Sequence, residues 1–343
     1  MATLKELAEY TGFSITTISR VLNNDPTMSV SDATRTSILD AAGKLHYRTS
    51  AAKVRSRTSR GRHLKFAMAE MLSPVEQLED PYYLYLKNYA VQRCTDLGYT
   101  VIPISGDPGL YTPLKSEKID GILAIGIFSE EQIEAMASLS DNLVFLDSAP
   151  DELHFDSVVL NFQLGVEQAV DYFLEHGHRE IGFLGPCRKL DQKKRPAPEV
   201  RREIFIRYMK QKDLYHPEFM LDASPMTASA SRKYLEERIA AGGPMPTAIL
   251  TANEEAAIGA AGALRSCQMS IPRDLSIISF NDTPLSALTD PPLTSVSTHV
   301  EAMSATAVDL LTRRASGQLP DIPLKIVVPP SLISRESVLD KLV

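Results

Sequence analysis

The N-terminal part of the chain carries apolar residues three and four positions apart, which is the spacing of one helix face. Thr3 and Glu6 match a capping box, in which each side chain accepts a hydrogen bond from a backbone amide at a helix start. A first helix is therefore expected from Thr3 or Leu4. Gly12 then gives the backbone the freedom that a tight turn requires. The apolar stripe of this helix comprises Leu4, Leu7 and Ala8.

A second helix is expected after Ser14, which is a good N-cap. The same spacing turns Ile18, Val21 and Leu22 toward a core. A third helix, capped by Ser31, completes a set that can enclose a small core. Its apolar residues are Ile38, Ala41, Ala42 and Leu45. The opposite face of the second helix carries Ile15, Thr16, Ser19, Arg20 and Asn23.

That opposite face is small and polar, holds one charge and begins with an isoleucine. It suits a DNA major groove, which offers thymine methyls and hydrogen-bond acceptors to a helix N-terminus. The alternative is that Ile15 packs inside and Arg20 is merely a solvated charge. Two capped helices joined by a glycine turn favour DNA recognition over this alternative.

From Leu64 onward, short apolar runs rich in β-branched residues alternate with helical segments such as 81–98, 164–176 and 201–213. This alternation predicts parallel sheets flanked by helices, and about 280 residues of it predict two lobes. The expected strands are 64–71, 100–104, 121–127, 142–147, 157–160, 181–185, 248–252, 275–280 and 324–328.

The chain resembles the LacI/GalR family of bacterial transcriptional repressors in three N-terminal segments, TLKELA from Thr3, GFSITTISRVLN from Gly12 and LHY from Leu45. The resemblance implies a homodimer that presents two recognition helices to a pseudo-palindromic, double-stranded DNA operator. It implies that bases are read by Ile15, Thr16 and Arg20, and that phosphates are contacted by Thr3, Ser14, Thr17 and Asn23.

Charge is unevenly distributed along the chain. The net charge is −7, but residues 1–63 hold ten Lys and Arg against five Asp and Glu, so this segment is +5 and the remainder −12. A basic head on an acidic body suits a partner that carries phosphates and contacts one end only.

Residues 48–62 are basic and contain few large apolar side chains, which by itself is typical of a solvated linker. The resemblance implies instead a hinge helix that folds on DNA and inserts an apolar wedge into the minor groove. The usual wedge leucine would fall at Ser56, so Val54 is the candidate wedge, with Arg55 beside it at the phosphates. Thr49 and Ser50 also replace the family's usual Pro-Asn.

The likeness extends through the rest of the chain, in segments that begin at Gly177, Ala248, Ile271 and Pro291. It implies an all-α helix-turn-helix headpiece (1–47), a hinge or linker (48–63) and an α/β two-lobed core like a periplasmic binding protein (64–343). The first lobe is expected to take about 64–160 and 290–322, and the second about 161–289 and 323–340. Ligands of such sheets bind at the carboxyl ends of strands, so the space between the lobes is the expected effector site.

Two polar side chains, Asp147 and Asn253, lie at the carboxyl ends of predicted strands and could bind vicinal hydroxyls of a sugar, although either could be only a capping residue. The resemblance adds further effector contacts, at Asp80, Tyr82, Tyr83, Arg202, Asn281, Thr298 and His299. DPYY from Asp80, together with His299, favours the subgroup that controls β-galactoside genes. Asn281, Glu254 and the Phe205-Ile206 pair depart from the family pattern, and they leave the identity of the effector open.

The leading hypothesis is a sugar-controlled, DNA-binding transcriptional repressor. One alternative is a purine-type regulator that its ligand activates, and another is a sugar-binding protein or enzyme with the same core. No nucleophile elbow, phosphate-cradling glycine loop or His/Cys cluster appears, so no enzyme, cofactor or metal site is expected. Residues 189–202 favour a surface loop over a second nucleic-acid patch, since the run of charges interleaves no aromatic residues.

Three features bear on location and assembly. The longest apolar run, 121–128, is too short to cross a membrane, and the N-terminus lacks a signal peptide, so a cytoplasmic, nucleoid-associated protein is expected. The three cysteines are scattered and receive no chemical role. Only nine residues follow Ser334, too few for a tetramerising coiled coil, so a dimer is expected.

Overall fold

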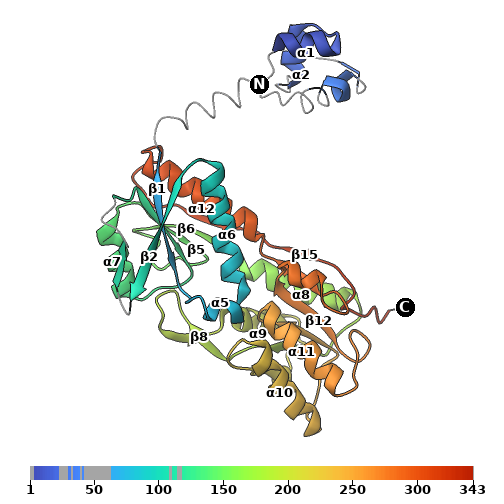
Figure 1. The fold of residues 1–343 in the computed structure, drawn as a ribbon. Helices are drawn as coiled ribbons and strands as arrows, with labels where there is room; N and C mark the ends of the chain where they lie inside the picture. The colour runs from blue at the N-terminus through green and yellow to red at the C-terminus, as the bar shows by residue number, and fades with distance from the viewer. Residues whose placement is uncertain are drawn as a thin grey trace. The chain divides into compact units, whose positions relative to one another are not determined.

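The computed structural model describes residues 4–22, 30–31, 34–38, 41, 63–107, 110–113 and 118–342 (Figure 1). The chain divides into two compact units, Met1–His63 and Leu64–Val343. Each unit has a hydrophobic core of its own.

The first unit contains helices α1 (Leu4–Thr11) and α2 (Ile15–Leu22), as predicted. Ser14 caps α2, because its Oγ accepts a hydrogen bond from the Thr17 amide at 3.1 Å, and Ser31 caps the next helical turn through the Thr34 amide at 3.2 Å. Gly12 makes the turn between the helices with a φ of +73°. The core is formed by Leu7, Ile18, Val21, Ile38 and Ala41. The predicted Thr3 cap, and the contributions of Ala42 and Leu45, lie outside the described residues.

The second unit holds two sheets. The seven-stranded sheet has the order β14-β6-β5-β4-β1-β2-β3. All its pairings are parallel except that of β3 with β2. Helices α5 (Glu76–Glu79), α6 (Pro81–Asp96), α7 (Glu130–Leu139) and α12 (Val300–Ala315) accompany it in the first lobe. Its strands are β1 (Lys65–Glu70), β2 (Thr100–Asp107), β3 (Leu110–Pro113), β4 (Gly121–Ile125), β5 (Leu143–Leu146), β6 (Asp156–Leu160) and β14 (Lys325–Val328).

The six-stranded sheet of the second lobe has the order β10-β7-β11-β12-β13-β15, with β15 antiparallel to β13. Its strands are β7 (Ile181–Leu184), β10 (Met220–Leu221), β11 (Ala248–Thr251), β12 (Ser276–Asn281), β13 (Thr294–Ser297) and β15 (Ser331–Ile333). The helical elements of this lobe are α8 (Phe162–Glu175), α9 (Val200–Gln211), η2 (Pro217–Phe219), α10 (Ala228–Ala240), α11 (Glu254–Ser266) and η3 (Pro284–Ala287). A separate hairpin pairs β8 (Arg188–Leu190) with β9 (Pro196–Pro198).

The centres of both sheets are buried on both faces. The central strands β4, β5, β7 and β11 are buried at every position, which explains why they appear in the sequence as continuous apolar runs rather than as alternating patterns. One apolar cluster includes Phe66 on β1 and Phe280 on β12, so it contributes to both lobes. All nine predicted strands and the three named helices are present, with ends shifted by a few residues.

The lobe boundaries differ from those expected. The segment 290–322 is expected in the first lobe, and α12 does pack there against α6 and β5, but β13 pairs with β12 in the second lobe. Conversely, 323–340 is expected in the second lobe, and β15 does pair with β13 there, but β14 pairs with β6 in the first lobe. Strand pairing depends on backbone hydrogen bonds between distant segments, which a local apolar pattern does not reveal. The chain therefore changes lobe after β6, after β13 and between β14 and β15.

Within the part of the chain that the structure describes, no helix has both the length and the apolar character needed to cross a membrane.

Candidate functional sites

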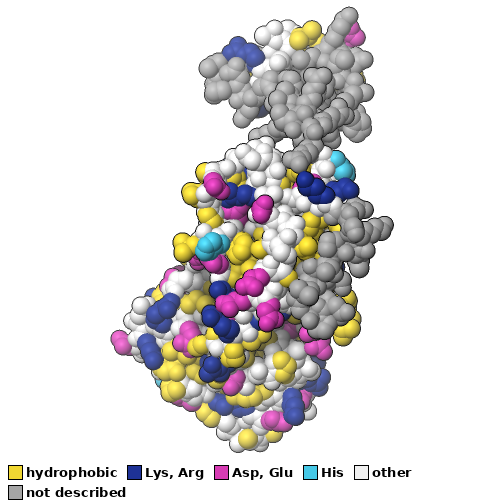
Figure 2. All heavy atoms as spheres, turned by 90° about the vertical axis from the view of Figure 1, so that its left-hand side faces the viewer, with side chains coloured by type: hydrophobic (Ala, Val, Ile, Leu, Met, Phe, Trp, Pro, Cys, Tyr) yellow, Lys and Arg dark blue, Asp and Glu magenta, His cyan; other side chains and the backbone are white. Residues whose placement is uncertain are grey.

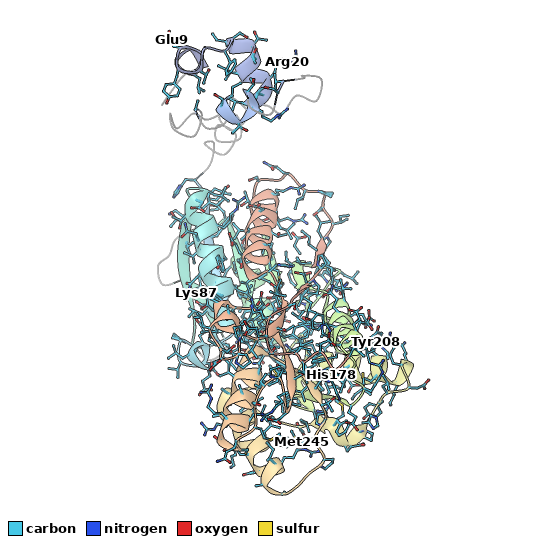
Figure 3. The ribbon with its side chains drawn as sticks, turned by 90° about the vertical axis from the view of Figure 1, so that its right-hand side faces the viewer. Glu9, Arg20, Lys87, His178, Tyr208 and Met245 are labelled. Carbon is cyan, nitrogen blue, oxygen red and sulfur yellow. The ribbon has the colours of Figure 1, made fainter. Side chains whose placement is uncertain are left out.

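The exposed face of α2 is the first candidate site. Ile15 is 48% exposed, whereas Ile18, three positions later, is completely buried. This excludes the alternative in which Ile15 packs inside. Thr16 and Arg20 are also exposed, and Figure 3 shows Arg20 on α2. The helix therefore presents an apolar side chain, a hydroxyl and a guanidinium, which match the methyl groups and acceptor atoms of base edges.

The start of α2 is suited to contact with phosphate. Ser14 is exposed, and its Oγ lies 2.8 Å from the Thr17 Oγ1, so two hydroxyls stand beside the unpaired amides of the first helical turn. The remaining predicted DNA contacts, Thr3, Asn23, Val54 and Arg55, lie outside the described residues.

The second candidate site lies where the carboxyl ends of strands from the two lobes meet, and we call it the interlobe cluster: Asp80, Tyr82, Tyr83, Asp147, Lys189, Glu199, Arg201 and Glu255. In this cluster the pKa values of Asp80, Tyr82, Tyr83, Asp147, Lys189, Arg201 and Glu255 are shifted by burial and by the charges of other cluster members. Mutual perturbation of this kind is typical of functional sites, though structural ion pairs also produce it.

Asp147 occupies the centre of this cluster. It follows β5 with a φ of +68°, and its two carboxylate oxygens accept hydrogen bonds from the hydroxyls of Tyr82 and Tyr83, each at 3.2 Å. The tyrosine rings lie edge to face with centroids 5.2 Å apart. Burial raises the pKa of Asp147, while the positive charge of Lys189 and the tyrosine hydroxyls lower it. A buried carboxylate with acceptor capacity beyond these two bonds can bind ligand hydroxyls.

Asp80 directly precedes helix α6 and provides a second acid. Its Oδ1 is buried and has no hydrogen-bond partner among the described residues. Burial raises the pKa of this carboxyl, and the charge of Lys189 opposes that shift. A buried carboxylate oxygen without a hydrogen bond lowers the stability of the folded protein. A ligand that donates a hydrogen bond to Asp80 Oδ1 would remove this cost.

The guanidinium that acts on Asp147 is that of Arg201, which sequence reasoning did not single out beside Arg202. Arg201 is 5% exposed, donates to Glu199 Oε1 at 2.7 Å, and stacks 5.3 Å from the Phe162 ring centroid. Its charge acts on Asp147 and Tyr83. Arg202 instead donates through Nη1 to the Gly185 carbonyl at 3.3 Å.

Asn253 has the capping role that the sequence left open. Its Oδ1 accepts from the Ala256 amide at 3.0 Å and so caps α11, while its Nδ2 donates to the Met226 carbonyl at 3.0 Å. Both ends of the amide are thus engaged within the second lobe.

Asn281 and Thr298 lie together at the ends of β12 and β13. Asn281 has a φ of +96° and is buried, and its carbonyl accepts a hydrogen bond from the Thr298 hydroxyl at 3.2 Å. The Thr298 side chain also interacts with the Tyr82 hydroxyl, and this contact connects the pair to Asp147.

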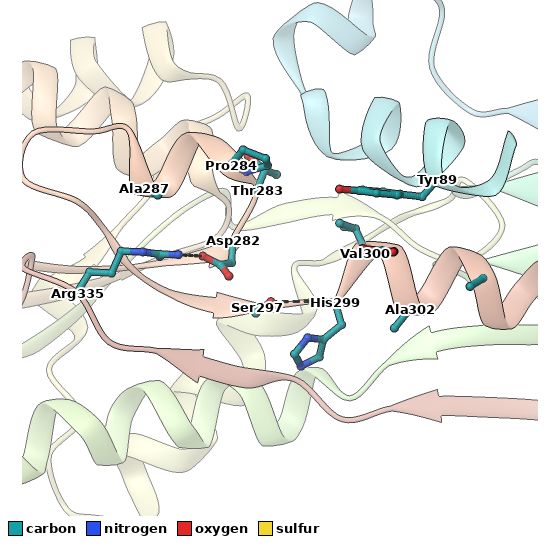
Figure 4. Close-up of a pocket in the computed structure, with 12 residues that line it drawn as sticks. Tyr89, Asp282, Thr283, Pro284, Ala287, Ser297, His299, Val300, Ala302 and Arg335 are labelled. Atoms are coloured by element: carbon teal, nitrogen blue, oxygen red, sulfur yellow. Dashed lines mark hydrogen bonds and ion pairs between the residues drawn. The ribbon is translucent and has the colours of Figure 1, made fainter. Parts of the chain in front are cut away.

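His299 faces a different pocket. Its φ is +52°, its Nε2 lies 2.9 Å from the Ser331 Oγ, and it lines a cavity of about 570 Å³ between α6, the start of α12 and residues 282–287 (Figure 4). Tyr89 of α6 forms one wall of this cavity, and the ion pair between Asp282 and Arg335, 2.8 Å long, forms another. The predicted effector residues are therefore not all brought together.

Sequence reasoning missed Lys189, Glu199, Arg201 and Glu255. Glu255 is 5% exposed, and its Oε2 has no partner among the described residues. Burial and the nearby charge of Asp80 raise its pKa to about 8. The only signal in the sequence was two glutamates directly after Asn253, at the start of an otherwise apolar helix. Among the described residues, no group of His, Cys, Asp and Glu has an arrangement that could hold a metal ion.

Both units of the chain are similar to known protein families. Residues 3–50 match the model for bacterial regulatory proteins of the lacI family, and residues 170–338 match the model for a periplasmic binding protein-like domain. The chain is 33% identical to the HTH-type transcriptional regulator GalR of Streptococcus thermophilus, over 92% of this chain and 93% of that protein. It is 31% identical to the HTH-type transcriptional regulator GanR of Bacillus subtilis (strain 168), over 98% and 99% respectively.

Solved structures share the fold. A lac repressor dimer bound to operator and the anti-inducer ONPF has a TM-score of 0.64 at 21% identity, covering 98% of this chain and 99% of that one. A complex of the transcriptional regulator CelR with cellobiose has a TM-score of 0.65 at 20% identity, covering 98% and 100%. The named sequence relatives are transcriptional regulators rather than enzymes, in line with the prediction from sequence. At these identities and over nearly its whole length, the chain belongs to the LacI family of bacterial regulatory proteins.

Proposed function

We propose that the protein is a transcriptional repressor that binds its operator as a homodimer and responds to a small sugar at the interlobe cluster. In this proposal Ile15, Thr16 and Arg20 read base edges, while Ser14 and Thr17 contact phosphates. The exposure of Ile15 beside a buried Ile18 supports this assignment. Thr3, Asn23, Val54 and Arg55 are further proposed DNA contacts. The dimeric lac repressor on its operator is the precedent in fold.

The effector assignment rests on one observation, the buried carboxylate of Asp147 at a strand end, held by two tyrosine hydroxyls. Asp147 would accept hydrogen bonds from vicinal sugar hydroxyls, Asp80 would accept another, and the adjacent tyrosines would supply an apolar face. Asn281 and Thr298 would contact the same ligand, and we expect less from Arg202, Asn253 and His299 because each is engaged elsewhere. CelR, which has this fold, was solved with cellobiose. A galactoside is our first candidate.

Control of DNA binding follows from linkage. A sugar changes operator affinity only if it binds one arrangement of the two lobes better than another. A sugar that weakens operator binding must then bind less tightly to the operator complex than to the free protein. This reciprocity gives the proposal a quantitative check.

A thermal-shift screen of the full-length protein tests the effector class. The panel contains galactose, lactose, melibiose, cellobiose, galactose 6-phosphate, guanine and hypoxanthine. A sugar that binds should stabilise the folded protein by about 2.7 kcal/mol at a hundredfold excess over its Kd. Asp147→Asn should abolish the shift for the active sugar. Stabilisation by a nucleobase and by no sugar would instead support the purine-type alternative, in which the ligand promotes DNA binding.

A further inference from the structure

The β8–β9 hairpin extends from the second lobe toward the first (Figure 1). Its base is held in the second lobe, where the Cys187 amide donates to Asp222 Oδ1 at 2.8 Å and the Glu199 amide donates to the Cys187 carbonyl at 3.2 Å. The sequence favoured a surface loop here. The structure instead has paired strands with a defined turn, residues 191–195, which we call the tip.

The tip is internally ordered by one carboxylate. Asp191 Oδ1 accepts hydrogen bonds from the amides of Lys193 and Arg195, at 2.8 and 2.9 Å, and Asp191 Oδ2 forms an ion pair with the Arg195 side chain at 2.8 Å. These bonds hold the pKa of Asp191 at about 2. The tip therefore presents the side chains of residues 192–194 in a fixed arrangement.

Those three side chains contact the first lobe. Gln192 Oε1 accepts a hydrogen bond from the Ala149 amide, beyond β5, at 2.8 Å. Lys193 Nζ lies 3.1 Å from Glu130 Oε1 at the start of α7. Lys194 Nζ lies 5.8 Å from the centroid of the Phe128 ring, within cation–π range. The hairpin thus connects the lobes at a place separate from the three chain crossings.

The surface around the hairpin is not a basic patch. On the side of the molecule where α7 and β8 lie in Figure 1, basic and acidic side chains are interspersed (Figure 2). This distribution does not suit a second nucleic-acid surface, which would concentrate one sign of charge.

The middle residue of β8 faces the interlobe cluster. Arg188 and Leu190 are exposed, whereas Lys189 between them is partly buried, as the alternation of a strand requires. The Lys189 charge acts on both Asp80 and Asp147. Its Nζ has no hydrogen bond to any residue that the structure describes, so three donors remain for a ligand.

We propose that the β8–β9 hairpin is a strap over the effector site, in which Lys189 contacts the effector and helps to determine specificity, while the tip fastens the strap to the first lobe. This inference rests on the proposed function. A hydroxyl placed between the Lys189 ammonium and the carboxylates of Asp80 and Asp147 would accept from the first and donate to the second. Such an arrangement selects an uncharged polyol with a hydroxyl at that position.

Two variants on the same strand test the role of Lys189. Lys189→Met and Arg188→Met each remove one positive charge, from the inner and the outer face of β8 respectively. Isothermal titration of the full-length protein with the sugar most active in the panel should show an approximately tenfold weaker Kd for Lys189→Met and no change for Arg188→Met. Equal Kd values for the two variants would overturn the assignment of Lys189.

The same pair gives a result without any ligand. Lys189→Met removes one of the two cations, Lys189 and Arg201, whose charges act on Asp80 and Asp147, so its Tm at neutral pH should be lower than that of Arg188→Met. Equal Tm values would show that Lys189 does not face the acids. If no sugar in the panel binds the wild-type protein, the proposed effector class fails, and the placement of Lys189 is then decided by this comparison.

The fastening of the tip is tested by hydrogen exchange on the ligand-free protein. Lys193→Ala on the tip and Glu130→Gln on the first lobe each break the same ion pair, between Lys193 and Glu130. Both variants keep Gln192, whose side chain accepts the hydrogen bond from the Ala149 amide. If the tip acts as a unit, both variants should accelerate exchange of the Ala149 amide, and Arg188→Met should not. Unchanged exchange of the Ala149 amide in both variants would show that the contacts of the tip are independent of one another and that the tip does not act as a unit.

Discussion

At the scale of single residues, the exposed face of α2 gives a direct prediction. Arg20→Ala removes a guanidinium that can bind a guanine through two hydrogen bonds, and this should cost about 1–3 kcal/mol and relax specificity at one operator position. Competition binding against all single-base variants of the operator measures both effects. Thr36→Ala, an exposed position outside α2, serves as a control and should leave the preference profile intact. An equal loss of affinity for all operator variants would indicate that Arg20 contacts the phosphate backbone of the DNA and not a base.

Glu255 gives a prediction on pH. Its pKa is raised from 4.5 to about 8, first by burial and then by the charge of Asp80, so the folded protein keeps a proton that the unfolded chain releases above pH 4.5. The contribution of this group to stability is therefore complete below pH 4.5 and is lost as the pH rises toward 8, at no more than about 1.4 kcal/mol per pH unit. Glu255→Gln should flatten that decline. Urea unfolding of the wild-type protein and of Glu255→Gln between pH 5 and 8 gives the free energy of unfolding at each pH. Parallel plots of that free energy against pH would contradict the raised pKa of Glu255.

The same residues show how far sequence reasoning reaches. Asp147 could be identified in advance because a polar residue that ends a buried strand lies at the edge where ligands of such sheets bind. Arg201 could not be distinguished from Arg202, since adjacent helical residues point about 100° apart and the rotation of α9 depends on its packing. Lys189 looked like part of a solvated charged run, because only the folded hairpin places it near acids from the other lobe.

At the scale of elements, helices α10 and α11 pack unusually closely at one glycine. A Cβ at Gly259 would lie 2.2 Å from the Ala228 carbonyl oxygen, whereas a Cβ at Gly262, on the same helix, would lie 3.5 Å from the nearest atom of Arg232. Gly259→Ala should therefore destabilise the fold by about 1–3 kcal/mol as the helices separate. Gly262→Ala should stabilise it by up to about 1 kcal/mol through helix propensity. Denaturant unfolding measures the change in the free energy of unfolding for each variant. Equal changes for Gly259→Ala and Gly262→Ala would contradict the close packing at Gly259.

Residues 48–62 remain a proposed hinge, and their charge makes the proposal measurable. If the segment contacts phosphates, replacing Arg55 and Arg57 together with Gln should reduce the slope of log K against log salt by about two, with no change in the preferred sequence. Fluorescence anisotropy over a range of salt concentrations gives the slope. An unaltered slope would indicate that residues 48–62 act only as a linker and do not contact phosphates.

Elements were predicted where burial produced long apolar runs and were missed where it did not. β4 and β11 were evident because parallel strands covered on both faces need apolar side chains throughout. β13, Thr294–Ser297, is fully buried but is composed mostly of small hydroxyl residues, so it did not stand out. Ser295 is satisfied there by the Ser279 hydroxyl of the neighbouring strand at 2.7 Å, a pairing that no local pattern reveals.

At the scale of the whole molecule, the fold class, the two-lobed organisation and the family were all reached from sequence, because each depends on periodicity or on contiguous motifs. Among the last segments, α12 and β15 lie in the lobes expected for them, but β13 and β14 do not, because these two strands join their sheets through long-range pairing. The position proposed for the effector site, between the lobes, could be inferred from topology, but the charged residues of the interlobe cluster come from four separate parts of the chain.

The alternation of the final strands between lobes has a consequence for synthesis of the protein. β14 completes the first sheet at one edge, and β15 completes the second at another, only a few residues later. Neither lobe can acquire its last strand until residues 325–333 have left the ribosome, even though most of the first sheet is translated early. A nonsense mutation before Lys325 would therefore deprive both lobes of an edge strand at once, and such a truncated product should be a substrate for proteolysis rather than a repressor lacking one activity.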